Sequence, residues 1–125
     1  MHTGKRIFIV DDDQDVIVSF KITLEDYGFK VDSYNDPLLA LSNFKPFFYD
    51  LLLIDIRMPN MTGFEFGLKI REVDANVKIC FITAFDIYYK SLLEEYPNMD
   101  FSCFIKKPIP PQALIERIEK ELSTV

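Results

Sequence analysis

The sequence predicts an α/β fold in which helices cover both faces of one parallel β-sheet. Short, continuous apolar runs alternate along the chain with stretches whose apolar residues recur at helical spacing. Apolar runs of about four to eight residues are typical of strands buried on both faces, as in a parallel sheet. Because the joins between the two kinds of segment are short, we expect right-handed crossovers and a single doubly wound domain.

Composition and charge argue against disordered, nucleic-acid-binding and membrane-spanning proteins. The 125 residues match the size of one domain, and 49% apolar with 27% charged residues is a globular rather than a disordered balance. The net charge of −6 makes direct binding to nucleic acid unexpected. No apolar run approaches the ~20 residues of a membrane helix, and the N-terminus lacks the apolar region of a signal peptide. We therefore expect a cytoplasmic protein without membrane contact.

The chain opens with a predicted strand at residues 7–10, which ends in a group of acidic residues. The helix that follows is capped by Asp13 and stopped by Gly28, and its apolar residues recur at helical spacing. We expect Asp15 to favour the positive end of this helix rather than to bind a metal. Residues 30–35 alternate between apolar and polar, as a strand near the sheet edge does.

The second helix and the third strand are marked by punctuating residues. Asp36 and Pro37 are a helix cap and a first helical residue, and Lys45–Pro46 ends that helix. The third strand, residues 51–55, is the most apolar and ends on the carboxylate of Asp55. A Pro and then Gly63 break the chain after it.

The second half of the chain repeats the alternation. Helices are predicted at residues 64–73, about 86–96 and 111–122, with strands at 77–82 and 101–105. The last helix opens at a pair of prolines and places its apolar residues on one face.

Functional side chains follow four of the strands. Asp11, Asp12, Asp55, Thr83 and Lys107 would meet at one edge, because the carboxyl ends of parallel strands share a side of the sheet. Close carboxylates repel one another unless a cation joins them, and oxygen ligands without His or Cys favour Mg²⁺. A lysine and a hydroxyl opposite the metal suit a phosphate, and a carboxylate so placed can form an aspartyl phosphate.

The sequence resembles a known family at these positions. Val10-Asp11-Asp12, Asp55 with Met58-Pro59 and Gly63, Thr83-Ala84 and Lys107-Pro108 are similar to the motifs of response regulator receiver domains of two-component signalling, of the chemotaxis type. The resemblance covers nearly the whole chain and implies one receiver domain over residues 1–125. It also implies a flavodoxin-like (βα)5 fold with strand order 2-1-3-4-5.

The resemblance implies a role for each site residue. Asp55 would accept a phosphoryl group from a histidine kinase or phosphotransfer protein. Asp12 and Asp55 would bind Mg²⁺, and Asp11 would hold metal-bound waters. The Arg57 backbone carbonyl would complete the shell. Thr83 and Phe104 would move on phosphorylation, and Lys107 would pair with the phosphoryl group.

The resemblance also implies a function. The protein would be a signalling switch that assists its own phosphorylation and dephosphorylation rather than an enzyme. A partner or output domain would read the switch on the face formed by the fourth helix, fifth strand and fifth helix.

The roles of two side chains beside the site, those of Arg57 and Phe85, are left with two interpretations each. The side chain of Arg57 could tune attack by water on an acyl phosphate, or could simply be solvated. Phe85 could shield the phosphoryl group, or cover the start of a helix. The segment between Phe85 and Lys107 contains three tyrosines, Tyr88, Tyr89 and Tyr96. We expect them to pack in the core rather than form an interface.

Two other functional classes remain as alternatives. Asp11-x-Asp13 resembles the signature of haloacid-dehalogenase-type phosphatases, although no second acidic pair follows the fourth strand. A receiver-like binding module that signals without phosphate is the other.

Cys80 and Cys103 are expected to be buried thiols rather than a disulfide. His2, a lone terminal histidine, is expected to have no chemistry.

Overall fold

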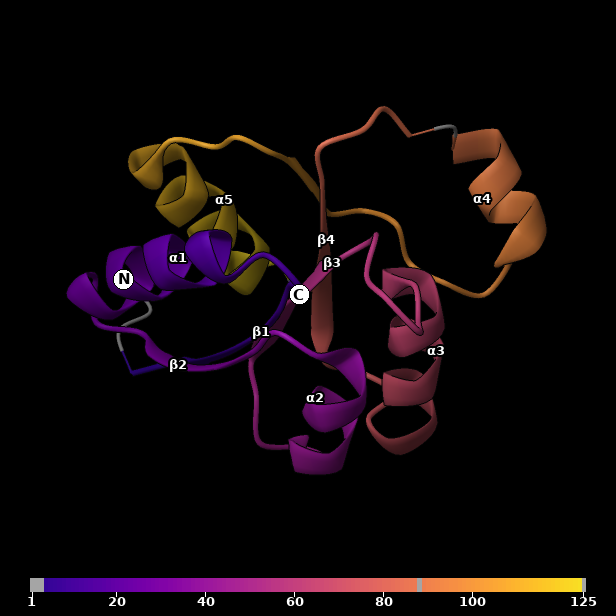
Figure 1. Ribbon diagram of the computed structural model, residues 1–125, viewed down its shortest axis with the longest axis horizontal. Coiled ribbons are helices and arrows are strands. Elements are labelled where there is room, and N and C mark those ends of the chain that lie inside the picture. The colour runs from indigo at the N-terminus through magenta and orange to yellow at the C-terminus, as the bar shows by residue number, and fades with distance from the viewer. Residues whose placement is uncertain (1–3, 88, 125) are drawn as a thin grey trace.

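The chain forms a five-stranded parallel sheet with helices on both faces (Figure 1). The computed structural model describes residues 4–87 and 89–124. The strands are β1 (Arg6–Val10), β2 (Lys30–Tyr34), β3 (Leu51–Asp55), β4 (Lys78–Thr83) and β5 (Phe104–Lys106). The helices are α1 (Gln14–Asp26), α2 (Pro37–Asn43), α3 (Gly63–Val73), α4 (Tyr89–Glu95) and α5 (Pro111–Ser123). The strand order is β2-β1-β3-β4-β5, which confirms the predicted flavodoxin-like (βα)5 topology.

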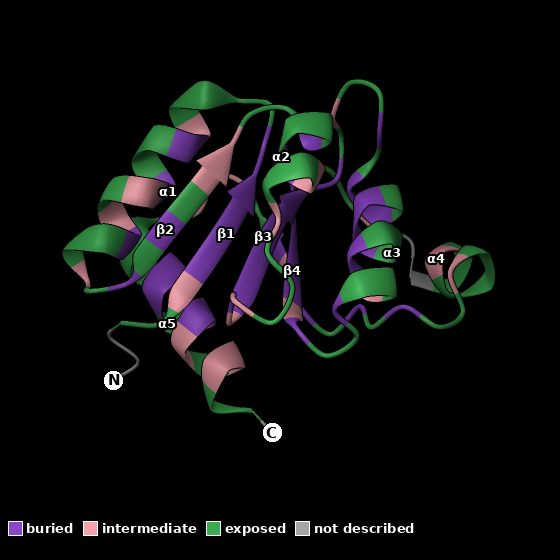
Figure 2. Ribbon diagram, turned by 90° about the horizontal axis from the view of Figure 1, so that it is seen from below, coloured by how far each residue is buried: buried purple, intermediate pink, exposed green. Residues whose placement is uncertain are grey.

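Each strand sends alternate side chains to two separate cores. On one face Ile7 and Ile9 of β1 pack with residues of α1 and α5. On the other face Phe8 and Val10 pack with residues of α2 and α3. Figure 2 shows β1, β3 and β4 buried along most of their length, while α1 and α3 keep one exposed side. This double burial explains why the central strands are continuous apolar runs.

Local start and stop signals act as predicted. The Asp13 side chain accepts hydrogen bonds from the backbone N–H groups of Asp15 and Val16 at the start of α1. Asp36 caps α2 in the same way, with Pro37 as its first residue. Gly28 adopts a φ of +103° just after α1, a conformation that glycine tolerates best.

The fifth strand is shorter than predicted and starts three residues later, at Phe104. Phe101 is buried against the α3 side of the sheet, so its apolar character reflects packing rather than strand pairing. Around Phe101, the Asp100 side chain accepts a hydrogen bond from the Ser102 backbone N–H. Such a side chain to backbone bond competes with strand pairing.

Of the tyrosines discussed above, Tyr96 is partly buried and its ring lies 5.4 Å from that of Phe64, centroid to centroid, which confirms the predicted packing. Tyr88 and the side chain of Tyr89 lie outside the described part of the chain, as does His2. Among the described residues, no helix has the length and apolar character needed to cross a membrane.

The prediction of reduced core thiols is wrong: Cys80 and Cys103 form a disulfide. Both are buried, as expected, but Cys80 on β4 lies opposite Cys103, the residue that precedes β5. The register pairs Phe81 with Phe104, so the preceding residue on each side is a cysteine. Their Cα atoms lie 4.6 Å apart, within the range that a disulfide spans. A sequence separation of 23 residues does not reveal this register.

Candidate functional site

Three carboxylates meet at the carboxyl edge of the sheet. Asp11 and Asp12 follow β1, and Asp55 is the last residue of β3. Oxygen atoms of all three side chains lie within 4.8 Å of one another. Asp11 is fully buried and Asp55 is 5% exposed, whereas Asp12 is exposed. The cluster predicted from the sequence is therefore assembled, with one of its members open to solvent.

Lys107 brings a positive charge to the cluster from the far side of β4. Its Nζ donates a hydrogen bond of 2.9 Å to Asp11 Oδ2 and lies 3.5 Å from Asp55 Oδ1. The Lys107 backbone N–H donates to the Thr83 carbonyl, and its peptide bond with Pro108 is cis. Burial alone would lower the pKa of Lys107, but the hydrogen bond to Asp11 and the charges of Asp11 and Asp55 raise it above its ordinary value. The lysine is thus held as a cation.

Lys107 only partly offsets the negative charge of the Asp55 carboxylate. Burial and the charge of Asp11 raise the pKa of Asp55 to about 7, while the charge of Lys107 opposes the rise. The hydrogen bond and charge of Asp12 add to it. One cation for three carboxylates leaves the cluster short of positive charge, and a bound divalent ion would supply it.

The donor set fits Mg²⁺. Carboxylate oxygens are hard ligands, and an exposed member such as Asp12 leaves room for the waters that Mg²⁺ retains. When bound, the ion would lower the charge density at Asp55 and polarise the oxygens of an anion placed above it. The predicted ligand role of the Arg57 backbone carbonyl stays a prediction.

Gly63 shapes the turn that follows Asp55. Its N–H donates a 2.8 Å hydrogen bond to the Ile56 carbonyl. A Cβ at this position would lie 2.3 Å from the backbone carbonyl oxygen of Asp55, closer than any real contact. Only glycine allows α3 to begin this close to the end of β3. The hydrogen bond between Gly63 and Ile56 closes the loop that contains Arg57.

Thr83 ends β4 beside the cluster and is 4% exposed. Its Oγ1 accepts a 3.0 Å hydrogen bond from the backbone N–H of Phe85. Phe104, at the start of β5, packs its ring 5.8 Å from Phe101 and 5.7 Å from Phe81, centroid to centroid. The aromatic ring is therefore part of the core on the α3 side.

Arg57 and Phe85 contact each other at the mouth of the site. The Arg57 guanidinium carbon lies 4.0 Å from the centroid of the Phe85 ring, a cation–π geometry. Phe85 is half exposed, and each residue stands two positions beyond a site residue, Asp55 or Thr83. The sequence singled out both positions but did not predict that they touch, because the contact joins two separate loops.

A groove beside the carboxylates was not predicted. It has a volume of about 460 Å³ and runs between α1 and the segment after β5. Val16 and Phe20 line one wall, and Lys107 and Ile109 line the other. The sequence does not show that these residues line one groove, because they come together only when α1 packs beside the segment after β5.

Comparison with known proteins identifies the family. The family model for the response regulator receiver domain matches residues 7–119. The chain belongs to the response regulator receiver domain family. Nothing in these similarities supports the phosphatase alternative or the module that works without phosphate.

Two curated relatives differ in the share of their length that this chain covers. The response regulator receiver protein CpdR of Brucella abortus (strain 2308) is 31% identical over 118 residues, which cover 94% of this chain and 97% of CpdR. The cyclic di-GMP phosphodiesterase response regulator RpfG of Xanthomonas campestris pv. campestris (strain 8004) is 33% identical over 116 residues. This alignment covers 91% of the chain but 31% of RpfG. The chain thus spans nearly all of one relative and about a third of the other.

Solved structures agree on the fold. A CheY-like receiver domain protein from Methanospirillum hungatei JF-1 has a TM-score of 0.83 and 30% identity, covering 96% of this chain and 94% of that chain. The non-phosphorylated HemR receiver domain from Leptospira biflexa has a TM-score of 0.85, and the match covers 98% of this chain and 97% of that chain. At 24% identity, the HemR match supports the fold alone.

Proposed function

We propose that this receiver domain is a Mg²⁺-dependent switch that is phosphorylated on Asp55. The supporting observation is a buried carboxylate at the end of β3, flanked by Asp11 and Asp12 and by the ammonium of Lys107. The phosphoryl group would come from the phosphohistidine of a histidine kinase or phosphotransfer protein, or from a small phosphodonor. Membership of the receiver family makes such a donor the natural partner.

In the proposed transfer, one Asp55 carboxylate oxygen attacks the phosphorus. The bond from phosphorus to the donor nitrogen breaks, and the electron pair leaves with the imidazole. Asp12 and the Arg57 carbonyl would hold Mg²⁺ directly and Asp11 would hold its waters, while Lys107 stabilises the transferring oxygens from the other side. In the dephosphorylation half of the cycle, water attacks the phosphorus and the bond from phosphorus to the Asp55 oxygen breaks. The products are the Asp55 carboxylate and inorganic phosphate, and the proton of the water passes to solvent.

Phosphorylation would change the structure through Thr83 and Phe104. The Thr83 hydroxyl now accepts a hydrogen bond from the Phe85 N–H and would turn to the phosphoryl group. Phe104, which is already partly packed against the core on the α3 side, would turn further inward. Thr83 ends β4 and Phe104 begins the neighbouring β5. We propose that a partner or output domain reads the face formed by α4, β5 and α5. Exposed Leu93 on α4 would offer that partner an apolar contact.

Residues 1–125 would act as one receiver domain in the cytoplasm, without binding nucleic acid directly. The domain would not turn over a separate substrate but would assist its own phosphorylation and dephosphorylation. Side chains of Arg57 and Phe85 would tune the second step.

The direct test is incubation with acetyl phosphate and Mg²⁺, followed by intact mass measurement. We expect a gain of one phosphoryl group that disappears with EDTA and in Asp55→Asn. Asp13→Asn is the matched control, because asparagine caps a helix as well as aspartate and Asp13 lies outside the buried cluster. It should be phosphorylated like the parent chain. Absence of a mass gain in the parent chain, or its persistence in Asp55→Asn, would overturn the proposal.

A further inference from the structure

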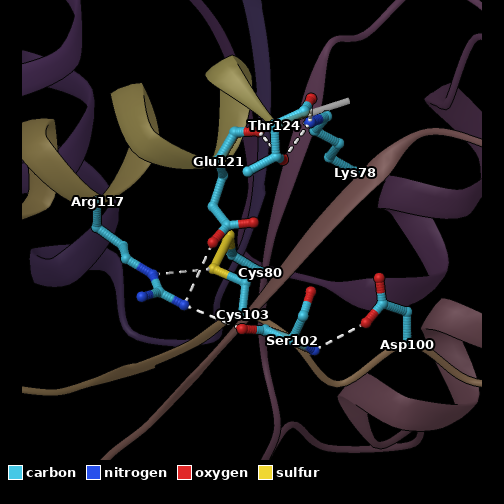
Figure 3. The surroundings of a disulfide bond; sticks show 8 residues. All are labelled: Lys78, Cys80, Asp100, Ser102, Cys103, Arg117, Glu121 and Thr124. Atoms are coloured by element: carbon cyan, nitrogen blue, oxygen red, sulfur yellow. Dashed lines mark hydrogen bonds and ion pairs between the residues drawn. A yellow bond between two sulfur atoms is a disulfide. The ribbon is translucent and has the colours of Figure 1, made fainter.

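The disulfide between Cys80 and Cys103 sits in polar surroundings, although it belongs to the core beneath α5 (Figure 3). Arg117 Nε donates a 3.4 Å hydrogen bond to Cys103 Sγ. Arg117 Nη2 lies 3.3 Å from Glu121 Oε1 and donates to the Ser102 carbonyl. The Glu121 carboxylate itself approaches both sulfur atoms to within 4.8 Å. A disulfide is neutral and needs no such partner, whereas a guanidinium stabilises a thiolate.

Cys103 is buried, but residues beside it reach solvent. Ser102 is exposed, and the side chain of Arg117 is 28% exposed. A cavity of about 220 Å³ lies on the same side and is lined by Ser102, Glu121 and Lys78, among others. The Lys78 ammonium in turn donates to the Thr124 and Glu121 carbonyls at the end of α5. A shift of Glu121, which lines this cavity and lies by both sulfur atoms, would therefore open a path to Cys103.

The disulfide is also close to the parts of the site that are proposed to move. Cys80 precedes Thr83 by three residues on β4, and Cys103 immediately precedes Phe104. The noncovalent ladder between the two strands is short, with register pairs from Phe81–Phe104 to Thr83–Lys106. The covalent bond adds a fixed point at one end of this ladder, and short edge pairings open most readily.

We propose that Cys80 and Cys103 are a reversible redox pair, with Arg117 as positioning residue for Cys103, and that their state controls how firmly β5 is held on β4. The consequence for phosphorylation rests on the function proposed above; the redox chemistry does not. In a reducing cytoplasm such a pair would be a dithiol at rest and would form the disulfide under oxidation.

The exchange is a two-electron reaction with a small dithiol as reductant. A thiolate of the dithiol attacks Cys103 Sγ, the bond between the two sulfurs breaks, and Cys80 leaves and takes up a proton. The second thiol of the reductant then displaces Cys103 as a thiolate beside Arg117. The protein ends as a dithiol and the reductant as a disulfide.

The first test measures the exchange itself. The full chain is incubated with graded dithiothreitol in native buffer, quenched with iodoacetamide, and analysed by intact mass and far-UV circular dichroism. We expect two alkylated cysteines to appear together in a chain that stays folded. A disulfide that resists dithiothreitol until the chain is denatured would overturn the proposal.

Variants of α5 test the role of Arg117. Loss of a charge-assisted contact to the departing thiolate should slow exchange about three- to tenfold in Arg117→Gln. Arg117→Lys, which keeps the charge, should recover part of the rate. Lys120→Gln, an exposed charge lost from the same helix, is the control and should exchange like the parent chain. Equal rates in Arg117→Gln and Lys120→Gln would remove Arg117 from the mechanism.

The second test asks whether redox state reaches the site. Amide hydrogen exchange of residues 104–107 should be several-fold faster in the reduced than in the oxidised chain. The double variant Cys80→Ala/Cys103→Ala should match the reduced chain whatever the redox buffer. Phosphorylation by acetyl phosphate should then differ between the two states of the parent chain. Equal exchange and equal phosphorylation would refute the coupling, whereas phosphorylation absent from both states would refute only the function proposed above.

Discussion

Lys107 and Asp11 form a direct ion pair, with 2.9 Å between Nζ and Oδ2, across the carboxyl edge of the sheet. Because Asp11 is fully buried, this bond compensates a charge that would otherwise be costly. The same ammonium is farther from Asp55, at 3.5 Å from Oδ1. The lysine therefore satisfies Asp11 first, and Asp55 is left as the carboxylate with the raised pKa.

Removal of the Asp55 charge should stabilise the metal-free fold at neutral pH. The pKa of Asp55 is about 7 in the folded chain against an ordinary 3.8. Between these values the folded state keeps a proton that the unfolded state has lost, so stability falls as pH rises through this window. Asp55→Asn has no such proton and should be more stable at pH 8 by up to about 4 kcal/mol, with no gain at pH 3.

Urea unfolding in EDTA at several pH values measures this difference. Asp13→Asn is the control, because Asp13 is exposed at the helix cap and should leave the pH profile of the parent chain unchanged. A gain in Asp55→Asn that is the same at pH 3 and pH 8 would mean that charge at Asp55 is not the cause.

Mg²⁺ affinity should depend on pH for the same reason. Below the pKa of about 7, the ion must displace a proton from Asp55. We expect affinity to fall about tenfold for each pH unit below about 7 and to level off above it. Isothermal titration calorimetry in two buffers of different ionisation enthalpy would count the proton released. Affinity that is constant from pH 5.5 to pH 8 would contradict the prediction.

Gly63→Ala should damage the turn after β3. The new Cβ would lie 2.3 Å from the Asp55 carbonyl oxygen and 2.9 Å from the Ile56 Cα, and neither backbone atom can move away cheaply. We expect a loss of about 1–3 kcal/mol in unfolding free energy, together with weaker Mg²⁺ binding.

Gly67→Ala, in the same helix, is the matched control for Gly63→Ala. Its Cβ would meet the flexible end of Met99 at 3.3 Å, and alanine is the better helix former by about 1 kcal/mol. Urea midpoints should therefore be unchanged or slightly higher in this variant. Equal losses at the two glycines would show that the close approach at Gly63 is unimportant.

Arg57 and Phe85 should act as a pair on the lifetime of the acyl phosphate. Their cation–π contact of 4.0 Å joins the loops that follow β3 and β4. We expect the two side chains to hinder attacking water together. Arg57→Ala and Phe85→Ala should each shorten the half-life about two- to fivefold, the rate equivalent of a contact worth about 0.5–1 kcal/mol.

The double variant Arg57→Ala/Phe85→Ala tests whether the two side chains act together. It should be little faster than either single variant, since each substitution already breaks the contact. Loss of the phosphoryl mass over time gives the half-lives. Unchanged half-lives in the single variants would remove both residues from the mechanism.

Much of the fold followed from local signals. The cap at Asp13, the cap at Asp36 and the stop at Gly28 act within one turn of the chain, so the sequence displays them directly. The continuous apolar character of β1, β3 and β4 reflects burial on both faces, which the two cores confirm. The start of β5 was misplaced, because a buried residue such as Phe101 has the same apolar signal in a loop as in a strand.

For this protein, the sequence alone was enough to determine the order of elements and which acids end the strands, because both depend on neighbours along the chain. Tertiary structure decided the contacts between separate elements: Lys107 on Asp11, Arg57 on Phe85, and Cys80 bonded to Cys103. These contacts depend on strand register and loop path, which are set by the packing of the whole domain. The disulfide is the clearest case, since a register shift of one residue would separate the two sulfur atoms.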